Sequence, residues 1–126
     1  MWVYLNGEIL DSSEANISPL DRAFTFGEGV YEVIPSYNKK LFLFSEHLSR
    51  LKSSLEKTFI PFPQELMNIE KVLHQLHDMN GFLNQSFYIQ VTRGVQEFRS
   101  HQVDSKIDPT IFISSQNLEI NPYRLN

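Results

Sequence analysis

A glutamate between two glycines begins the part of the sequence where chemistry could be concentrated. Glu28 lies between Gly27 and Gly29, directly before a run of β-branched and aromatic residues, Val30 to Tyr37, that predicts a strand. Glycine permits unusual backbone dihedral angles and the close approach of another group. The spacing differs from that of phosphate-binding glycine loops, and no helix follows. On the pattern alone, a structured loop that enters a strand is the favoured interpretation.

Within the predicted strand, side chains alternate between two faces. Tyr31 and Val33 share one face, and Glu32 shares the other face with Ile34. A glutamate among apolar strand residues either faces solvent, which is the more common case, or is held by a partner such as Arg22. A tyrosine near the start of a strand usually packs its ring and satisfies its hydroxyl locally.

Arg50 lies on a predicted helix whose apolar stripe consists of Leu48, Leu51, Leu55 and Phe59, with Ser45 as a candidate N-cap. Its position is roughly 145° from the stripe, so its side chain points away from the core of this domain. It is either a solvated arginine, which is the more common case, or a group that faces a phosphate or another domain. A planar guanidinium is well suited to the second role.

A second basic cluster follows a later predicted strand, Phe87 to Arg93, which is closed by Gly94. Beyond Arg93, the polar loop carries Arg99 and His101. Such a loop can bind a carboxylate through charge-assisted hydrogen bonds.

The sequence lacks the residues or motifs that several other catalytic chemistries require. The chain has no cysteine, which excludes disulfides, thiol nucleophiles and metal sites built on thiolates. No metal site is expected, and His74 and His77 on a second predicted helix are interpreted as surface residues. There is no nucleophile-elbow motif, and none of the lysines has the context of a buried, desolvated residue that could attach a carbonyl compound.

Length and charge narrow the class of protein further. A chain of 126 residues with 41% hydrophobic residues is one domain with a real core. Its net charge of −4 argues against nucleic-acid binding. The apolar stretches are too short to span a membrane and no signal peptide is visible, so we expect a cytoplasmic protein.

The elements that must position these residues are strands, then two helices, then strands. Asn6-Gly7 predicts the turn of an N-terminal hairpin, and a turn at Asn38–Lys40 joins the Val30 strand to another from Leu41 to Phe44. The second helix has an apolar stripe that ends before Gly81 and consists of Leu66, Ile69, Leu73, Leu76 and Met79. A last strand is expected from Ile111 to Ser114. The order predicts an α+β domain, a mostly antiparallel sheet with two consecutive helices packed on one face.

Three motifs in this order resemble the fold-type IV (class IV) pyridoxal-phosphate enzymes. They are DRAFTFGEGVYEV at residues 21–33, HLSRL at 47–51 and YIQVTRG at 88–94. Within that family the likeness is greatest to the D-amino acid aminotransferases, because of Tyr31 and the element Arg99-x-His101. The loop from Gly94 to Arg99 is one residue longer than in that subfamily, and Phe98 stands where proline is usual.

The resemblance implies an enzyme that uses pyridoxal 5'-phosphate to exchange an amino group between a D-amino acid, D-alanine, and a 2-oxo acid such as 2-oxoglutarate. Arg50 would hold the cofactor phosphate. Tyr31, Arg99 and His101 would bind the substrate carboxylate, with Arg99 and His101 reaching in from the other subunit of a homodimer. Val33 would line the substrate pocket.

The resemblance also implies a further domain. Residues 1–116 correspond to the N-terminal small domain of the family and residues 117–126 to the start of the interdomain linker. The lysine that attaches the cofactor would lie in a C-terminal domain beyond this sequence. The fragment alone is therefore expected to be inactive, and to oligomerise or to have limited solubility because apolar surface is exposed.

Three alternatives stay open. The parent protein could be an aminodeoxychorismate lyase, which uses the same cofactor but eliminates pyruvate, or a branched-chain L-aminotransferase. From a different class, the chain could be a non-catalytic dimerising domain that inherits the fold without the function. Such a domain would not bind pyridoxal phosphate.

Overall fold

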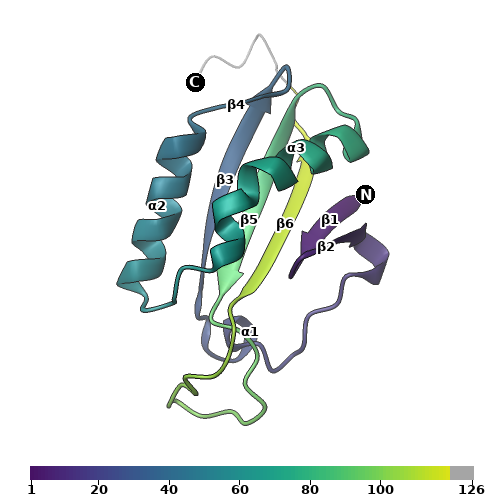
Figure 1. Cartoon of the computed structure of the whole chain (residues 1–126). Helices are drawn as coiled ribbons and strands as arrows, with labels where there is room; N and C mark the ends of the chain where they lie inside the picture. The colour runs from purple at the N-terminus through teal and green to yellow at the C-terminus, as the bar shows by residue number, and fades with distance from the viewer. Residues whose placement is uncertain (120–126) are drawn as a thin grey trace.

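One antiparallel sheet organises the chain. The computed structural model describes residues 1–119, in which six strands form a single sheet (Figure 1). Across the sheet the order is β2 (Glu8–Asp11), β1 (Trp2–Leu5), β6 (Thr110–Asn117), β5 (Gln85–Thr92), β3 (Gly29–Tyr37) and β4 (Lys40–Leu41). Every neighbouring pair of strands is antiparallel. The α+β fold class is confirmed.

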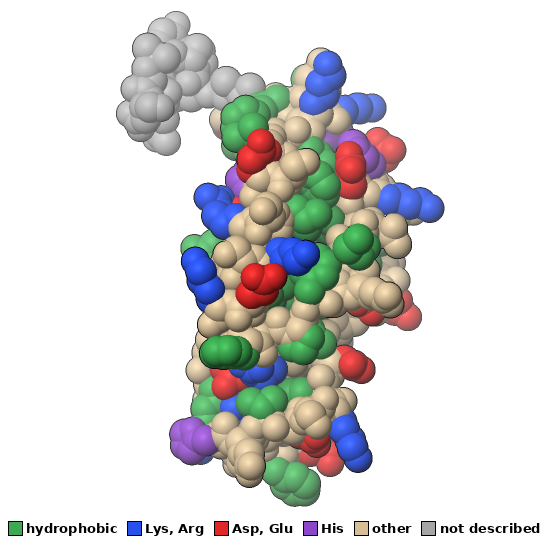
Figure 2. Space-filling view, turned by 60° about the vertical axis from the view of Figure 1, so that its left-hand side comes forward, with side chains coloured by type: hydrophobic (Ala, Val, Ile, Leu, Met, Phe, Trp, Pro, Cys, Tyr) green, Lys and Arg blue, Asp and Glu red, His purple; other side chains and the backbone are tan. Residues whose placement is uncertain are grey.

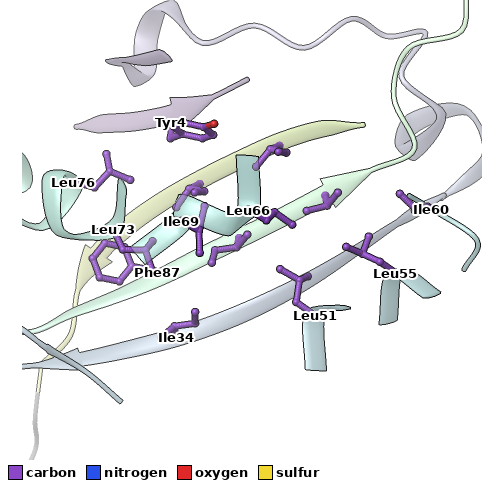
Figure 3. Close-up of a cluster of buried hydrophobic side chains, with 14 residues drawn as sticks. Tyr4, Ile34, Leu51, Leu55, Ile60, Leu66, Ile69, Leu73, Leu76 and Phe87 are labelled. Atoms are coloured by element: carbon purple, nitrogen blue, oxygen red, sulfur yellow. The ribbon is translucent and has the colours of Figure 1, made fainter. Parts of the chain in front are cut away.

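Two longer helices cover one face of this sheet. They are α2 (Phe44–Lys57) and α3 (Ile69–Asn80), and Figure 1 shows both on the same side. Between them lies the short 3-10 helix η2 (Gln64–Asn68), and another, η1 (Ser12–Glu14), follows the N-terminal hairpin. The core between helices and sheet is drawn in Figure 3 and includes Ile34, Leu51, Leu55, Leu66, Leu73, Leu76 and Phe87. Burial of these apolar side chains stabilises the fold.

The hairpin turn and the end of α3 follow the sequence signals. Asn6 and Gly7 both have positive φ, 48° and 98°, as a tight turn between β1 and β2 requires. Gly81 ends α3 in the left-handed conformation, with φ of 80°. Asparagine and glycine tolerate these angles best, so these local signals predict the structure well.

The expected strand from Leu41 to Phe44 is wrong after its first residue. Leu43 takes the left-handed conformation, with φ of 52°, and the chain turns there directly into α2 at Phe44. Leu43 is the N-cap residue and offers no side-chain hydrogen bond, so the expected cap at Ser45 is also wrong. Phe44 and Leu41 pack against the core from either side of this turn, and tertiary packing outweighs the local preference for a strand.

The apolar stripes extend less far than the spacing predicts. Helix α2 ends at Lys57, and Phe59 has φ of 58° and is 84% exposed. Ile60 is buried in the core instead, with its amide bound to the Leu55 carbonyl. In α3, Met79 is exposed rather than buried. Both errors fall at a helix end, where the helical period no longer determines which side is buried.

A short helix, α1 (Arg22–Phe26), forms part of the segment that the sequence predicted as a structured loop before β3. The Asp21 side chain caps it by accepting from the Ala23 amide. The second oxygen of the same carboxylate accepts from the hydroxyls of Thr92 on β5 and Thr110 on β6. This buried aspartate ties α1 to the ends of two strands, so the glycine-flanked segment enters β3 from a defined position.

The face opposite the helices carries exposed aromatic and aliphatic side chains, among them Tyr31 and Val33. β4 pairs with β3 only at Ser36 and Tyr37. Within residues 1–119, no strand pairs with the outer edge of β3 from Gly29 to Ile34. Seen from the side of α2, hydrophobic groups lie between charged ones on the surface (Figure 2).

The C-terminal strand reaches the start of the expected interdomain linker. β6 runs to Asn117, so the expected linker at 117–126 begins where the last strand ends, and residues 120–126 of that segment lie outside the described residues. None of the helices in residues 1–119 is long and apolar enough to cross a membrane.

Candidate functional site

The helix-facing side of β3 carries a buried carboxylate that holds Arg50. Glu32 is 5% exposed, and both of its oxygens accept from Nε of Arg50, at 2.8 and 3.2 Å. The Nη2 group of Arg50 also donates to Oε1 of Glu32. Nδ1 of His47 lies 2.8 Å from the same oxygen. The strand and helix α2 are therefore joined by one carboxylate and two basic side chains.

Electrostatics keep this pair ionised. Burial raises the pKa of Glu32, but the hydrogen bonds from Arg50 and His47 outweigh burial and hold that pKa below its usual value. The hydrogen bond to Glu32 raises the pKa of Arg50 in turn. The interpretation of Glu32 as a solvent-facing residue is wrong, and its partner is Arg50 rather than Arg22.

Arg50 has hydrogen-bond donors that Glu32 does not use. Its side chain is 67% exposed, although its guanidinium is fixed along one edge by Glu32. Among residues 1–119, no group accepts a hydrogen bond from its Nη1. An oriented guanidinium with free N–H groups fits a phosphate oxygen. The structure thus offers a donor set that suits the expected role of Arg50, which stays a prediction.

Tyr31 and Val33 lie on the other face of the same strand. The ring of Tyr31 stacks on that of Tyr88, with 5.6 Å between centroids and 27° between planes. The Tyr88 hydroxyl donates to Gln90, and burial, followed by the charge of Tyr31, raises the pKa of Tyr88. Tyr31 itself is 63% exposed, and its hydroxyl has no hydrogen-bond partner among the described residues. The ring is packed as expected, whereas the expectation that the hydroxyl is satisfied locally is wrong for the described residues.

A second ion-pair cluster lies at the start of β3 and the end of β5. Glu28 accepts from Nε and Nη2 of Arg22, at 2.8 and 2.7 Å, and from Nε of Arg93 at 2.5 Å. The hydrogen bond from Arg22 is the main reason why the pKa of Glu28 is lowered to about 2. Glu28 is therefore ionised throughout the physiological pH range.

Arg22 and Arg93 use their remaining donors on backbone carbonyls. Nη1 of Arg22 donates to the Ser100 carbonyl at 2.5 Å, and its Nη2 lies 3.4 Å from the His101 carbonyl. Arg93 donates to the carbonyls of Thr58 and Phe59, each at 2.8 Å. Arg22 thus ties the glycine-flanked segment to the 98–101 loop, and Arg93 ties it to the end of α2.

The side chains of Arg99 and His101, in the 98–101 loop, lie against the ring of Phe26. The guanidinium of Arg99 lies 4.7 Å from the ring centroid, and the His101 ring lies 5.1 Å away at 58°. Arg22 approaches the same ring at 4.3 Å. These distances are typical of cation–π and tilted aromatic contacts.

The predicted site residues therefore fall into two groups. Tyr31 and Val33 lie on one face of β3, and Arg50 contacts the other face of the same strand through Glu32. Arg99 and His101 meet on Phe26, and within residues 1–119 no hydrogen bond or ring contact joins them to Tyr31.

The two histidines on α3 have different surroundings, since His74 is exposed and His77 is buried. No group of three metal-ligating side chains occurs in the described part of the chain. His77 is buried rather than on the surface, and its Nε2 lies 3.3 Å from the Leu83 carbonyl. This hydrogen bond gives the buried ring a structural role at the end of α3.

The sequence patterns drew attention to Glu28 only as part of a structured loop and to Arg22 only as a possible partner of Glu32, and they did not show that Arg22 and Glu28 pair with each other. They also did not show that Glu32 is buried. For Glu32 a signal existed, because its strand partner in alternation is the core residue Ile34, and a glutamate on a core-facing position needs a charged partner. For Arg22, the partners Ser100 and His101 lie nearly eighty residues away, and no local pattern relates them.

Comparison with known proteins adds a family and a fold. The model of the family described as amino-transferase class IV matches residues 29–126. A D-alanine aminotransferase of Staphylococcus aureus (strain N315) is 35% identical over 122 residues, which cover 96% of this chain and 43% of that protein. A D-alanine aminotransferase of Listeria monocytogenes (serotype 1/2a, strain 10403S) is 36% identical over 103 residues, covering 82% of this chain and 36% of the relative. The chain spans less than half the length of these relatives.

Solved structures share the fold. The branched-chain aminotransferase of the archaeon Thermoproteus uzoniensis superposes with a TM-score of 0.82 at 22% identity, over 94% of this chain and 41% of that chain. A branched-chain aminotransferase from Escherichia coli gives 0.85 at 16% identity, over 93% and 41%. At these identities the likeness concerns the fold alone.

Proposed function

Because the chain belongs to the class IV aminotransferase family, we propose that it is the N-terminal small domain of a pyridoxal-phosphate-dependent aminotransferase. In this proposal the described residues bind the cofactor phosphate and the substrate carboxylate. The lysine that attaches the cofactor would belong to a further domain, because every lysine of this chain is exposed and none has the buried setting that such a lysine needs. The domain by itself is then inactive.

The observation that carries the proposal is the state of Arg50. Glu32 fixes the guanidinium along one edge, the side chain is 67% exposed, and among residues 1–119 no group accepts a hydrogen bond from its Nη1. A fixed, always-charged donor loses little conformational entropy when it binds a phosphate. Arg50 would therefore hold the phosphate of pyridoxal 5'-phosphate. The bound cofactor supplies the electron sink for removal of a proton from the substrate α-carbon.

The substrate carboxylate would be bound on the other face of β3. The free hydroxyl of Tyr31 is one donor, and Val33 beside it provides an apolar wall. Arg99 and His101 provide the charged and neutral donors that favour a carboxylate. Since they lie on Phe26 and not against Tyr31 of the same chain, they would serve the site of a second subunit in a homodimer.

The choice of D-alanine is supported by the curated relatives, which are D-alanine aminotransferases at 35–36% identity. We assign D-alanine and 2-oxoglutarate as substrates and pyruvate and D-glutamate as products, in the cytoplasm. Aminodeoxychorismate lyase and branched-chain L-aminotransferase are the alternative activities, and the likeness of fold does not discriminate between them.

The test uses the full-length protein that contains this chain, loaded with pyridoxal phosphate. It is given D-alanine or L-alanine together with 2-oxoglutarate, and pyruvate formation is followed. Pyruvate from D-alanine alone supports the proposal. L-leucine and aminodeoxychorismate in parallel assays detect the two alternatives.

Absence of pyruvate from both enantiomers, with the cofactor bound, contradicts the assignment of D-alanine. Failure to bind pyridoxal phosphate at all contradicts the aminotransferase and lyase alternatives together and favours a non-catalytic dimerising domain. The 126-residue chain alone serves as the control, for which no turnover is expected.

A further inference from the structure

We propose that Arg22 is a positioning residue, which holds the backbone of the 98–101 loop so that Arg99 and His101 are presented to the substrate carboxylate. The inference rests on the proposed function of these two side chains. Arg22 would contact neither substrate nor cofactor, because its donors are used within the protein. It would act through the loop.

The contacts of Arg22 are unusual for an arginine. The residue is 1% exposed, and its side chain donates to both oxygens of Glu28 along one edge. Its other edge reaches the carbonyls of Ser100 and His101, which belong to the two residues that follow Arg99. A buried guanidinium satisfied in this way is costly to disturb, since any lost partner leaves a charged donor unpaired in the interior.

Phe26 extends this contact from the backbone to the side chains. The ring has Arg22 at 4.3 Å and Arg99 at 4.7 Å, and His101 tilts against it. Both α1 residues, Arg22 and Phe26, therefore touch the loop, one at its backbone and one at its functional side chains. The orientation of Arg99 and His101 depends on where α1 lies.

The rest of the loop is held differently. Gln96 links parts of the loop to one another, through the carbonyls of Phe98 and Gln102 and the amide of Asp104. These bonds shape the interior of the loop. Among the hydrogen bonds in residues 1–119, those from Arg22 are the ones that join residues 100 and 101 to the body of the domain.

Arg93 provides a matched control for Arg22. Both arginines donate to Glu28, but Arg93 spends its remaining donors on Thr58 and Phe59 at the end of α2. A lysine at either position keeps the charge but lacks the planar fork that reaches a carboxylate and a carbonyl together. Arg22→Lys should therefore release the loop, and Arg93→Lys should not.

The sequence contains its own probe of loop position. Trypsin cleaves after Arg99 and after Lys106, and both bonds lie in the exposed loop between β5 and β6. Only the first bond is next to the carbonyl that Arg22 binds. The ratio of cleavage at Arg99 to cleavage at Lys106 in the native full-length protein reports local release of the 98–101 loop, whereas general unfolding raises both rates.

The experiment compares wild type, Arg22→Lys and Arg93→Lys in the full-length holoenzyme by mass spectrometry of limited digests and by steady-state kinetics. We expect Arg22→Lys to raise the cleavage ratio about tenfold, and the KM for D-alanine by a similar factor with kcat changed less, because loss of hydrogen bonds to a charged group is of this size. Affinity for pyridoxal phosphate, measured by absorbance titration, should be unchanged. Arg93→Lys should alter neither the ratio nor the KM.

An unchanged cleavage ratio in Arg22→Lys overturns the inference whatever the substrate proves to be. A raised ratio with unchanged KM also overturns it. In that case Arg99→Lys separates two causes: if it raises KM, the loop matters and Arg22 does not position it, and if it does not, the proposed binding role of Arg99 itself fails.

A second variant covers the case in which Arg22→Lys does not fold. Phe26→Leu leaves the Arg22–Glu28 pair in place but removes the ring against which Arg99 and His101 lie. It should raise the KM for D-alanine and leave the cofactor affinity unchanged. Wild-type KM in this variant contradicts the inference.

Discussion

The two ion-pair clusters use the same residue types in opposite ways. At the junction of β3 and α2, the carboxylate of Glu32 is buried and its partner Arg50 is 67% exposed. At the start of β3, Arg22 is buried and its partner Glu28 is 25% exposed. Arg50 is bound along one edge, and no group among residues 1–119 accepts from its Nη1. Arg22 instead uses its Nε, Nη1 and Nη2 groups in hydrogen bonds within the protein.

This difference in burial fits the two proposed roles, in which Arg50 binds a ligand and Arg22 positions a loop. A half-engaged arginine at the surface can still bind an anion, since its orientation is set in advance and its charge is not fully compensated. A buried arginine whose donors are all satisfied cannot take a ligand without losing protein contacts. We therefore expect changes at Arg22 and Glu28 to affect stability first, and changes at Arg50 and Tyr31 to affect ligands first.

The largest effect is expected for Glu28→Gln. This change leaves buried Arg22 without its counter-charge, and removal of one partner of a buried pair should lower the free energy of unfolding by about 3 kcal/mol. Urea unfolding at pH 7 measures it. Glu56→Gln, on the exposed face of α2, is the matched control and should change the free energy by less than about 0.5 kcal/mol. Equal effects of the two changes would contradict the comparison.

The same cluster predicts acid sensitivity. The pKa of Glu28 is about 2 in the folded chain, against 4.5 for a free side chain, so folding favours the ionised form. The stabilisation is complete above about pH 5 and is lost as the pH falls toward 2, a contribution of about 3 kcal/mol. In urea unfolding from pH 6 to pH 2, the difference between wild type and Glu28→Gln should shrink toward zero. A constant difference over this range would show that Glu28 does not titrate as expected.

Arg50→Lys should have a smaller effect and a different target. The lysine keeps the charge beside Glu32 but loses the second edge of the guanidinium. Affinity of the full-length protein for pyridoxal phosphate should fall about tenfold, or about 1.4 kcal/mol. Unfolding of the cofactor-free protein should change by less than about 1 kcal/mol. Binding of pyridoxal, which lacks the phosphate, is the control and should be unaffected, whereas equal losses for both compounds would argue against a phosphate contact.

Tyr31→Phe should give the smallest change. The hydroxyl has no partner among the described residues, so the free energy of unfolding should stay within about 0.5 kcal/mol of wild type. The KM for D-alanine in the full-length enzyme should rise about fivefold, the value of one lost hydrogen bond. Tyr88→Phe, whose hydroxyl donates to Gln90 instead, is the matched control for the kinetic effect.

The period of the hydrophobic pattern predicted helices and strands well where tertiary packing and local conformational preference favour the same structure. The hairpin at Asn6-Gly7, the long strand β3 and the helix that ends at Gly81 follow their signals. The pattern failed where the chain changes direction. At Leu43 and Phe59 a non-glycine residue takes a positive φ, which costs energy that only tertiary contacts offset.

The candidate site was predicted in part for a related reason. Helical spacing correctly turned Arg50 away from the core, and strand alternation correctly paired Tyr31 with Val33 on one face. Alternation also put Glu32 beside Ile34, but the more common exposed state was preferred over a buried pair. A rule about the average glutamate cannot identify the one that has two basic partners on a neighbouring helix.

The sequence by itself determined the fold class, the order of strands and helices along the chain, and the residue types that could bind a phosphate or a carboxylate. These properties depend on the periods of strands and helices and on motifs that lie within short segments. The tertiary structure alone decided which charges meet. Glu28 meets Arg93 across 65 positions of the chain, and Arg22 meets the Ser100 carbonyl across 78. Because electrostatic interactions depend on distance and burial in space, only folding decides which arginine stays exposed, as Arg50 does, and which is buried among its partners, as Arg22 is.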